Sequence, residues 1–174
     1  FTSHMKEYGE TWKKLNVGFD TIYSGFLGSI DQIDIVSDFI TQNKNAYVIV
    51  DPVMGDGGNY YQTFNDEICN KIKDLVKVSD LVTPNLTEAC LLTNNKYHTN
   101  YTLEDTLKLA KEIANLGPQK VIITGILIDD NIINLGYDKE SDESFSYSLK
   151  YNNKSYSGTG DIFTSIISGL ITNG

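Results

Sequence analysis

Short apolar runs along this chain alternate with longer segments in which apolar residues recur every three or four positions. Residues 46–51, AYVIVD, form a nearly continuous apolar run, which is typical of a strand buried on both faces of a parallel sheet. After Ser29, Ile30, Ile33 and Val36 have the spacing of one helical face. The pattern predicts strands at 20–26, 46–51, 80–83 and 120–124, helices at 5–15, 29–40, 65–76 and 102–116, and a further helix capped by Asn85.

The last third of the chain has a different pattern. Residues 131–137 and 144–151 are predicted to be strands joined by the polar turn 138–143, DKESDE, and to form an antiparallel pair. Gly158 then begins a last apolar helix. Repeated strand–helix units indicate an α/β fold of three layers, a mostly parallel sheet with helices on both faces and a late antiparallel hairpin. Length favours a single domain over residues 1–174.

Composition limits the possible partners. The 174 residues include 14 Lys and Arg against 23 Asp and Glu, a net charge of −9 that disfavours nucleic acid or an anionic membrane as a partner. An anionic ligand would need helix N-termini, backbone amides or a bound cation. No apolar run reaches the length of a membrane-spanning helix and no signal pattern precedes the first helix, so we expect a cytoplasmic protein. Cys69 and Cys90 lack metal-binding spacing and are expected to be reduced thiols.

Polar motifs stand where the predicted strands end, and open parallel sheets bind ligands at that edge. Asp51 and Asp56 lie five residues apart in the loop DPVMGDGG, and such carboxylates suit Mg²⁺. The alternative is an ordinary turn, in which Asp and Gly are common. Thr83, Asn85 and Glu88 belong to TPNLTE, which could contribute to the same site or serve only as a capping box.

The motif SGTGD, residues 157–161, is the sharpest of these signals. Its glycines precede an apolar helix, so consecutive amides and the helix dipole can form an anion hole with Asp161 at the rim. The alternative is a simple favourable charge at a helix N-terminus. The motif is neither a P-loop nor a dinucleotide-binding fingerprint, because GxxxxGK[ST] is absent and the third glycine of GxGxxG is missing. Thr124-Gly125, at the end of another strand, is a weaker signal of the same kind.

In this order, DPVMGDGG, TPNLTE and GTGD resemble the signature motifs of pyridoxal kinases in the ribokinase-like superfamily. Residues 24–29, SGFLGS, and 1–4, FTSH, are similar to two further segments of that family. The resemblance implies a ribokinase-like fold and ATP-dependent phosphorylation of the 5′-hydroxymethyl group of pyridoxal, pyridoxine or pyridoxamine. It implies ATP and Mg²⁺ as cofactors and leaves open a monovalent cation such as K⁺ and a homodimer.

The resemblance also implies a role for each matching residue. Asp161 matches the catalytic base and also contacts the vitamin, and Gly158, Thr159 and Gly160 match the anion hole. The remaining positions match residues for ATP (Asp51, Asn85, Thr124 and Tyr61), for the metal (Asp56, Thr83 and Glu88) and for the vitamin (His4 and Phe26).

The chain departs from the family pattern in three places. It lacks the family's opening strand and ends soon after the Asp161 helix, so we expect residues 1–174 to be an incomplete kinase domain. Because the helical pattern already starts at Met5, we also expect residues to be missing between His4 and Met5.

Two other functions compete with pyridoxal kinase. A hydroxymethylpyrimidine kinase would share the fold, the reaction and part of the motifs, but Gly55-Asp56 and Gly160-Asp161 favour the pyridoxal kinases. A non-catalytic protein that binds vitamin B6 is the alternative of a different class. The joint presence of Asp56, Glu88 and Asp161 argues against it.

Overall fold

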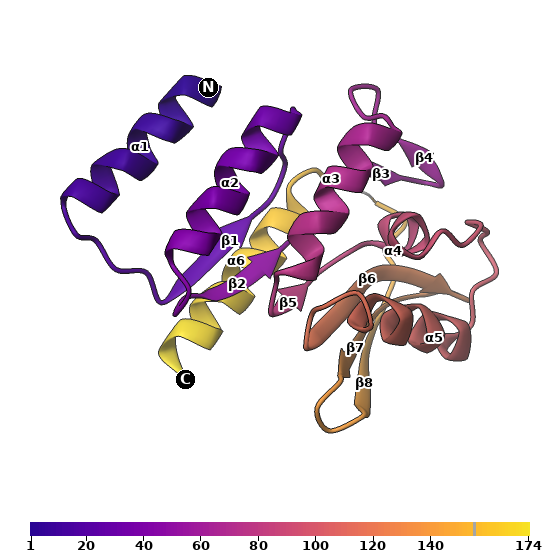
Figure 1. Ribbon diagram of the computed structural model, residues 1–174. Helices are drawn as coiled ribbons and strands as arrows, with labels where there is room; N and C mark the ends of the chain where they lie inside the picture. Colours follow the sequence, from indigo (N-terminus) through magenta and orange to yellow (C-terminus); the bar gives the residue numbers. More distant parts are fainter. Residues whose placement is uncertain (155) are drawn as a thin grey trace.

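The computed structural model describes residues 1–154 and 156–174 and contains a six-stranded sheet in the order β1-β2-β5-β6-β7-β8 (Figure 1). A second sheet consists of the short strands β3 and β4. The helices are α1 (Thr2–Lys14), α2 (Ile30–Gln42), α3 (Asp66–Lys77), α4 (Leu86–Thr93), α5 (Leu103–Ala114) and α6 (Thr159–Asn173). The strands are β1 (Thr21–Ser24), β2 (Tyr47–Val50), β3 (Gly55–Asp56), β4 (Asn59–Tyr60), β5 (Leu81–Val82), β6 (Lys120–Ile128), β7 (Asn131–Asp138) and β8 (Glu143–Lys150).

The first four strands of the large sheet run parallel, as predicted. Ser24 is in register with Val50, and Val50 with Val82, so β1, β2 and β5 all end at one edge of the sheet. A single bridge between Asn85 and Thr124 continues this alignment beyond β5. The polar residues that follow these strands are therefore brought together, which is the arrangement expected of an open parallel sheet.

The antiparallel part of the sheet is larger than the sequence pattern predicts. The hairpin of β7 and β8 is confirmed, but β6 also pairs antiparallel with β7 and extends to Ile128. The predicted end of this strand at Thr124 was wrong. Gly125 has a φ of 70° and lies where the register shifts between Ile123 and Ile126. The irregularity interrupts the apolar alternation without ending the strand.

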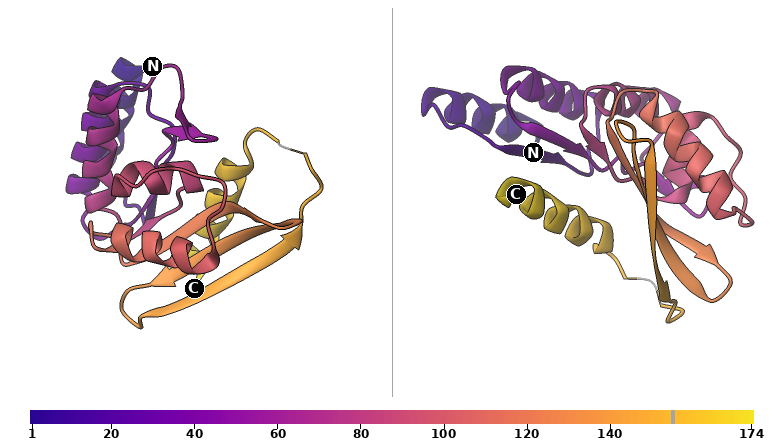
Figure 2. Two further views of the ribbon diagram at one scale, coloured as in Figure 1. Left: turned by 90° about the vertical axis from the view of Figure 1, so that its right-hand side faces the viewer. Right: turned by 90° about the horizontal axis from the view of Figure 1, so that it is seen from below.

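Helices cover both faces of the sheet, which confirms the predicted three layers. Figure 2 shows α2, α3 and α5 on one face and α6 on the other. In the described part of the chain, α6 is the only helix on that second face. α1 packs against α2 through the rings of Trp12 and Phe39. None of the helices in the described residues is long and apolar enough to cross a membrane.

Local capping residues set the helix starts. Asn65 caps α3, and Thr102 and Asp105 form a capping box at α5, as predicted. α1 differs, because it begins at Thr2 and not at Met5. The amide of Met5 donates to the carbonyl of Phe1, so the polar residues between them form a helical turn that apolar spacing could not reveal.

Candidate active site

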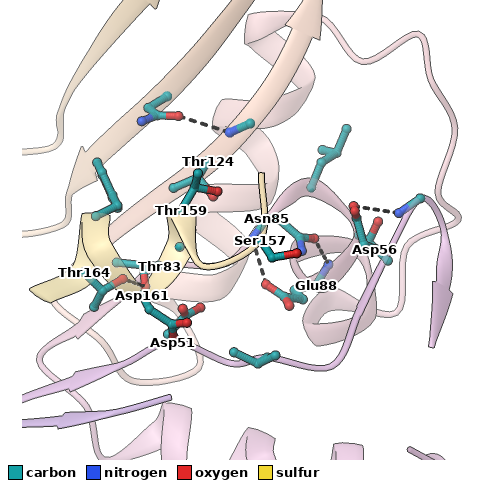
Figure 3. A pocket seen from close by; sticks show the side chains of 18 of the residues that line it. Asp51, Asp56, Thr83, Asn85, Glu88, Thr124, Ser157, Thr159, Asp161 and Thr164 are labelled. Carbon is teal, nitrogen blue, oxygen red and sulfur yellow. Dashed lines mark hydrogen bonds between the residues drawn. The ribbon is translucent and has the colours of Figure 1, made fainter. Parts of the chain in front are cut away.

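A cavity of about 1040 Å³ opens at the carboxyl ends of the parallel strands (Figure 3). Loops after β1, β2 and β5, the middle of β6 and the start of α6 all contribute to its wall. The lining includes every predicted site residue except His4, namely Phe26, Asp51, Asp56, Tyr61, Thr83, Asn85, Glu88, Thr124, Gly158, Thr159, Gly160 and Asp161. The fold thus brings together residues that lie more than a hundred positions apart in the sequence.

The start of α6 forms one wall of this cavity. Gly158 is its N-cap and has a φ of 82°, a left-handed conformation that favours glycine. Thr159, Gly160 and Asp161 follow in the first turn, whose amides have no acceptor within the helix. The N-terminus of α6 therefore points the positive end of the helix dipole and its backbone amide donors toward the cavity, next to the Asp161 carboxylate.

Asp51 and Asp161 form a pair of neighbouring carboxyl groups, one from the end of β2 and one from α6 (Figure 3). Asp51 is only 7% exposed, and burial together with the negative charge of Asp161 raises the pKa of Asp51 to about 7. Gly160 brings α6 close to Asp51, because a Cβ atom there would be in ordinary van der Waals contact, 3.5 Å from Oδ2 of Asp51. A proton or a cation between the two carboxyl groups would relieve their repulsion.

Glu88 and Asn85 hold the loop after β2 against α4. Glu88 is 3% exposed and accepts hydrogen bonds from the amides of Met54 (3.1 Å) and Asn85 (2.8 Å) through its two carboxylate oxygens. The Asn85 side chain donates to the carbonyl of Gly55. Burial raises the pKa of Glu88 to about 8, although both amides favour its ionised form. The predicted capping box is confirmed.

The predicted metal residues surround the same space but differ in their freedom to bind an ion. Asp56 is exposed and accepts one hydrogen bond, from the amide of Gly57. The hydroxyl of Thr83 contacts that of Thr164 at 3.1 Å, and both oxygens of Glu88 already bind amides. In the part of the chain that the structure describes, no three His, Cys, Asp or Glu side chains gather as a metal cluster. This donor set fits Mg²⁺ that takes most of its ligands from phosphate and water.

Aromatic rings line the cavity beside the loop after β1. Phe26 and Tyr61 both pack edge-on against Phe64, with ring centroids 5.6 Å and 6.4 Å apart. His4 does not reach the cavity and lies in the first turn of α1. The same turn does approach this loop, because Gln32 bonds to the hydroxyl of Thr2 and to the amide of Gly28.

Sequence reasoning missed several residues of the site. Tyr23 donates a hydrogen bond to Oδ1 of Asp161 at 3.3 Å, and Thr164 follows Asp161 by one helical turn. Thr87 accepts a hydrogen bond from the amide of Gly58 and so anchors the β3–β4 turn. The strand predicted at 20–26 could have indicated the direction of the Tyr23 side chain. Successive side chains of a strand point to opposite faces, so Tyr23 points away from the face on which Ile22 is buried.

The sequence profile that describes phosphomethylpyrimidine kinase matches residues 14–174 of this chain. The chain belongs to the phosphomethylpyrimidine kinase family. Within that family it is similar to the pyridoxal kinase of Arabidopsis thaliana, with 29% identity over 157 residues, covering 85% of this chain and 49% of the relative. The chain spans about half the length of the curated relatives it matches.

Solved structures of relatives agree with this family and confirm the ribokinase-like fold. A Bacteroides thetaiotaomicron protein, provisionally assigned as a phosphomethylpyrimidine kinase and crystallised with pyridoxal, is 36% identical with a TM-score of 0.93, over 99% of this chain and 62% of that one. The Staphylococcus aureus pyridoxal kinase in complex with AMP-PCP is 29% identical with a TM-score of 0.81, over 97% and 60%. The resemblance to pyridoxal kinases that the motifs indicate is confirmed.

Proposed function

We propose that the protein containing this chain transfers a phosphoryl group from ATP to the 5′-hydroxymethyl group of pyridoxal, pyridoxine or pyridoxamine. The observation that carries the proposal is the position of Asp161, in the first turn of α6, beside a glycine N-cap and facing a cavity at the strand ends. The relatives crystallised with pyridoxal and with an ATP analogue support both substrates.

Asp161 acts as the general base in this proposal. It accepts the proton of the acceptor hydroxyl as the oxygen attacks the terminal phosphorus of ATP, while the bond from that phosphorus to the bridging oxygen breaks and ADP leaves. The amides of Gly158, Thr159 and Gly160 hold the negative charge that develops on the transferred group. Because phosphoryl transfer depends mainly on positioning and charge stabilisation, the short distance between base and helix N-terminus is the central feature.

The nucleotide occupies the part of the cavity bounded by the loops after β2 and β5 and by the middle of β6. Asp51, Asn85, Thr124 and Tyr61 line this part and are assigned to ATP. Asp56, Thr83 and Glu88 are assigned to the Mg²⁺ site, with Asp56 the least engaged by the protein itself. Bound Mg²⁺ would neutralise phosphate charge in a protein that is itself acidic. K⁺ is the proposed monovalent cation, and its addition to the assay tests that role.

The vitamin occupies the side near Asp161 and Phe26. The Phe26 ring is 58% exposed and is available to contact an aromatic ligand. A vitamin-binding role for His4 stays a prediction, because His4 does not line the cavity. His4→Ala, measured as the KM for pyridoxal, tests it.

Asp161→Asn tests the proposed base. The amide cannot accept the proton, so kcat for pyridoxal phosphorylation by the full-length protein should fall by about 10²–10⁴ with little change in KM. Asp31→Asn makes the same change in the first turn of α2, away from the cavity, and serves as the control. Turnover of Asp161→Asn equal to that of Asp31→Asn would contradict the assignment.

A hydroxymethylpyrimidine kinase is the second candidate, because the family profile that matches the chain describes phosphomethylpyrimidine kinase. The reaction and the base would be the same, so only the acceptor distinguishes the two. A non-catalytic protein that binds vitamin B6 would bind pyridoxal but consume no ATP. Finally, we propose a homodimer as the assembly, which the mass in solution tests.

A further inference from the structure

The side chain of Tyr23 extends from β1 toward α6, and its hydroxyl contacts Asp161. Along β1, Ile22 and Ser24 are buried, whereas Thr21 and Tyr23 alternate toward the opposite face, where α6 lies. Two side-chain hydrogen bonds join the strand to this helix. The first joins the hydroxyls of Thr21 and Thr172 at 2.8 Å. In the second, the Tyr23 hydroxyl donates to Oδ1 of Asp161 at 3.3 Å. β1 thus contacts both the last and the first turn of α6.

The Tyr23 hydroxyl lies close to Gly25 and beside acidic side chains. Gly25 leaves the space that the hydroxyl needs, because a Cβ atom there would lie 3.2 Å from Oη of Tyr23 and 3.7 Å from Oδ1 of Asp161. Burial and the charges of Asp51 and Asp161 raise the pKa of Tyr23 well above its usual value. A phenol is already protonated at neutral pH, and these surroundings strengthen that state, so Tyr23 is the donor and the carboxylate the acceptor.

We propose that Tyr23 is a positioning residue that holds one oxygen of Asp161 and leaves the other, Oδ2, to accept the proton of the acceptor hydroxyl. This inference rests on the proposed function, because it concerns the same base. Asp161 is an exposed side chain, and without a partner its carboxyl group would rotate among several orientations. A fixed carboxylate raises the share of bound substrates in a reactive geometry, which affects kcat more than KM.

Tyr23→Phe tests the proposal in the full-length protein. It removes the hydroxyl and retains the ring, so kcat for pyridoxal should fall about tenfold while the KM values for pyridoxal and ATP change by less than about twofold. Thr21→Val is the matched control, because it removes the other hydrogen bond between β1 and α6 at the end of the helix far from Asp161. Its kcat should equal that of the wild type.

Each result separates the two proposals. Equal loss of kcat in Tyr23→Phe and Thr21→Val would overturn the positioning role, because the effect would then come from helix docking. Unchanged kcat in Tyr23→Phe, with kcat lost in Asp161→Asn, would also overturn it and leave the proposed function standing. Absence of phosphorylation by the wild type, or full turnover by Asp161→Asn, would overturn the proposed base and the role of Tyr23 with it.

Discussion

At the scale of single residues, the carboxyl groups of Asp51 and Asp161 carry most of the argument. Neither is informative alone, since Asp51 ends a strand and Asp161 starts a helix, both ordinary positions for aspartate. Their proximity and the burial of Asp51 favour a proton or a cation between them, whereas the N-terminus of α6 beside them favours negative charge. A buried acidic group with a raised pKa, such as Asp51, is frequent at functional sites.

The raised pKa of Asp51 makes the stability of the ligand-free protein depend on pH. The folded state binds a proton on Asp51 up to about pH 7, whereas the unfolded chain loses it near 3.8, so the free energy of unfolding falls as pH rises through this window. Asp51→Asn should remove a decrease on the order of 2–4 kcal/mol between pH 4 and 8. Urea unfolding at several pH values measures it.

Asp130→Asn, in the exposed turn between β6 and β7, is the control for this pH dependence and should leave it as in the wild type. The same slope in Asp51→Asn and in the wild type would show that Asp51 is ionised in both the folded and the unfolded state.

At the scale of elements, one buried side chain helps to hold the loop after β2 against α4. Glu88 links Met54 to the start of α4 through two backbone amides. Glu88→Gln replaces one of the two acceptors by a donor, so one buried amide loses its partner. The free energy of unfolding should fall by about 1–3 kcal/mol.

Glu104→Gln, on the exposed first turn of α5, provides the comparison for Glu88→Gln. Its ion pair with Lys108 is exposed, and the expected change is within about 0.5 kcal/mol. Equal stability of the two variants in denaturant unfolding would mean that the Glu88 contacts contribute nothing measurable.

The elements differ in how well the sequence could predict them. The buried run of β2 and the capping box at Asn85 have strong local signals, and both are confirmed. The antiparallel pairing of β6 with β7 was missed, because Gly125 interrupts the apolar alternation. The hairpin of β3 and β4 was also missed, since Gly57 and Gly58, both with positive φ, indicate only a glycine-rich loop.

The site was predictable as a set of strand ends, but its internal contacts were not. The order of the strands in the sheet decides which loops lie side by side. We expected the motifs after β2, after β5 and before α6 to lie at one edge of the sheet, and they line one cavity. The bond between Tyr23 and Asp161 joins residues 138 positions apart and depends on the face that β1 presents to α6. No local pattern encodes such a contact, which is why the sequence did not reveal it.

At the scale of the whole molecule, the two faces of the sheet differ. The face toward α2, α3 and α5 holds the main core, whereas the other carries exposed apolar side chains. On β8, Phe145, Tyr147 and Leu149 are each more than half exposed, and Phe145 lies over Gly136. An apolar surface of this kind is usually covered in a native protein.

Since the chain spans about half of the length of its curated relatives, activity is best measured on the full-length protein.

The most direct test is the choice of phosphoryl acceptor. Full-length protein with MgATP is offered pyridoxal and hydroxymethylpyrimidine in parallel, and the phosphorylated products are identified by mass. We expect pyridoxal 5′-phosphate as the main product, with a kcat/KM for pyridoxal at least about tenfold higher than for the pyrimidine, a difference of about 1.4 kcal/mol in transition-state binding. Phosphorylation of the pyrimidine alone, or of neither compound, would contradict it.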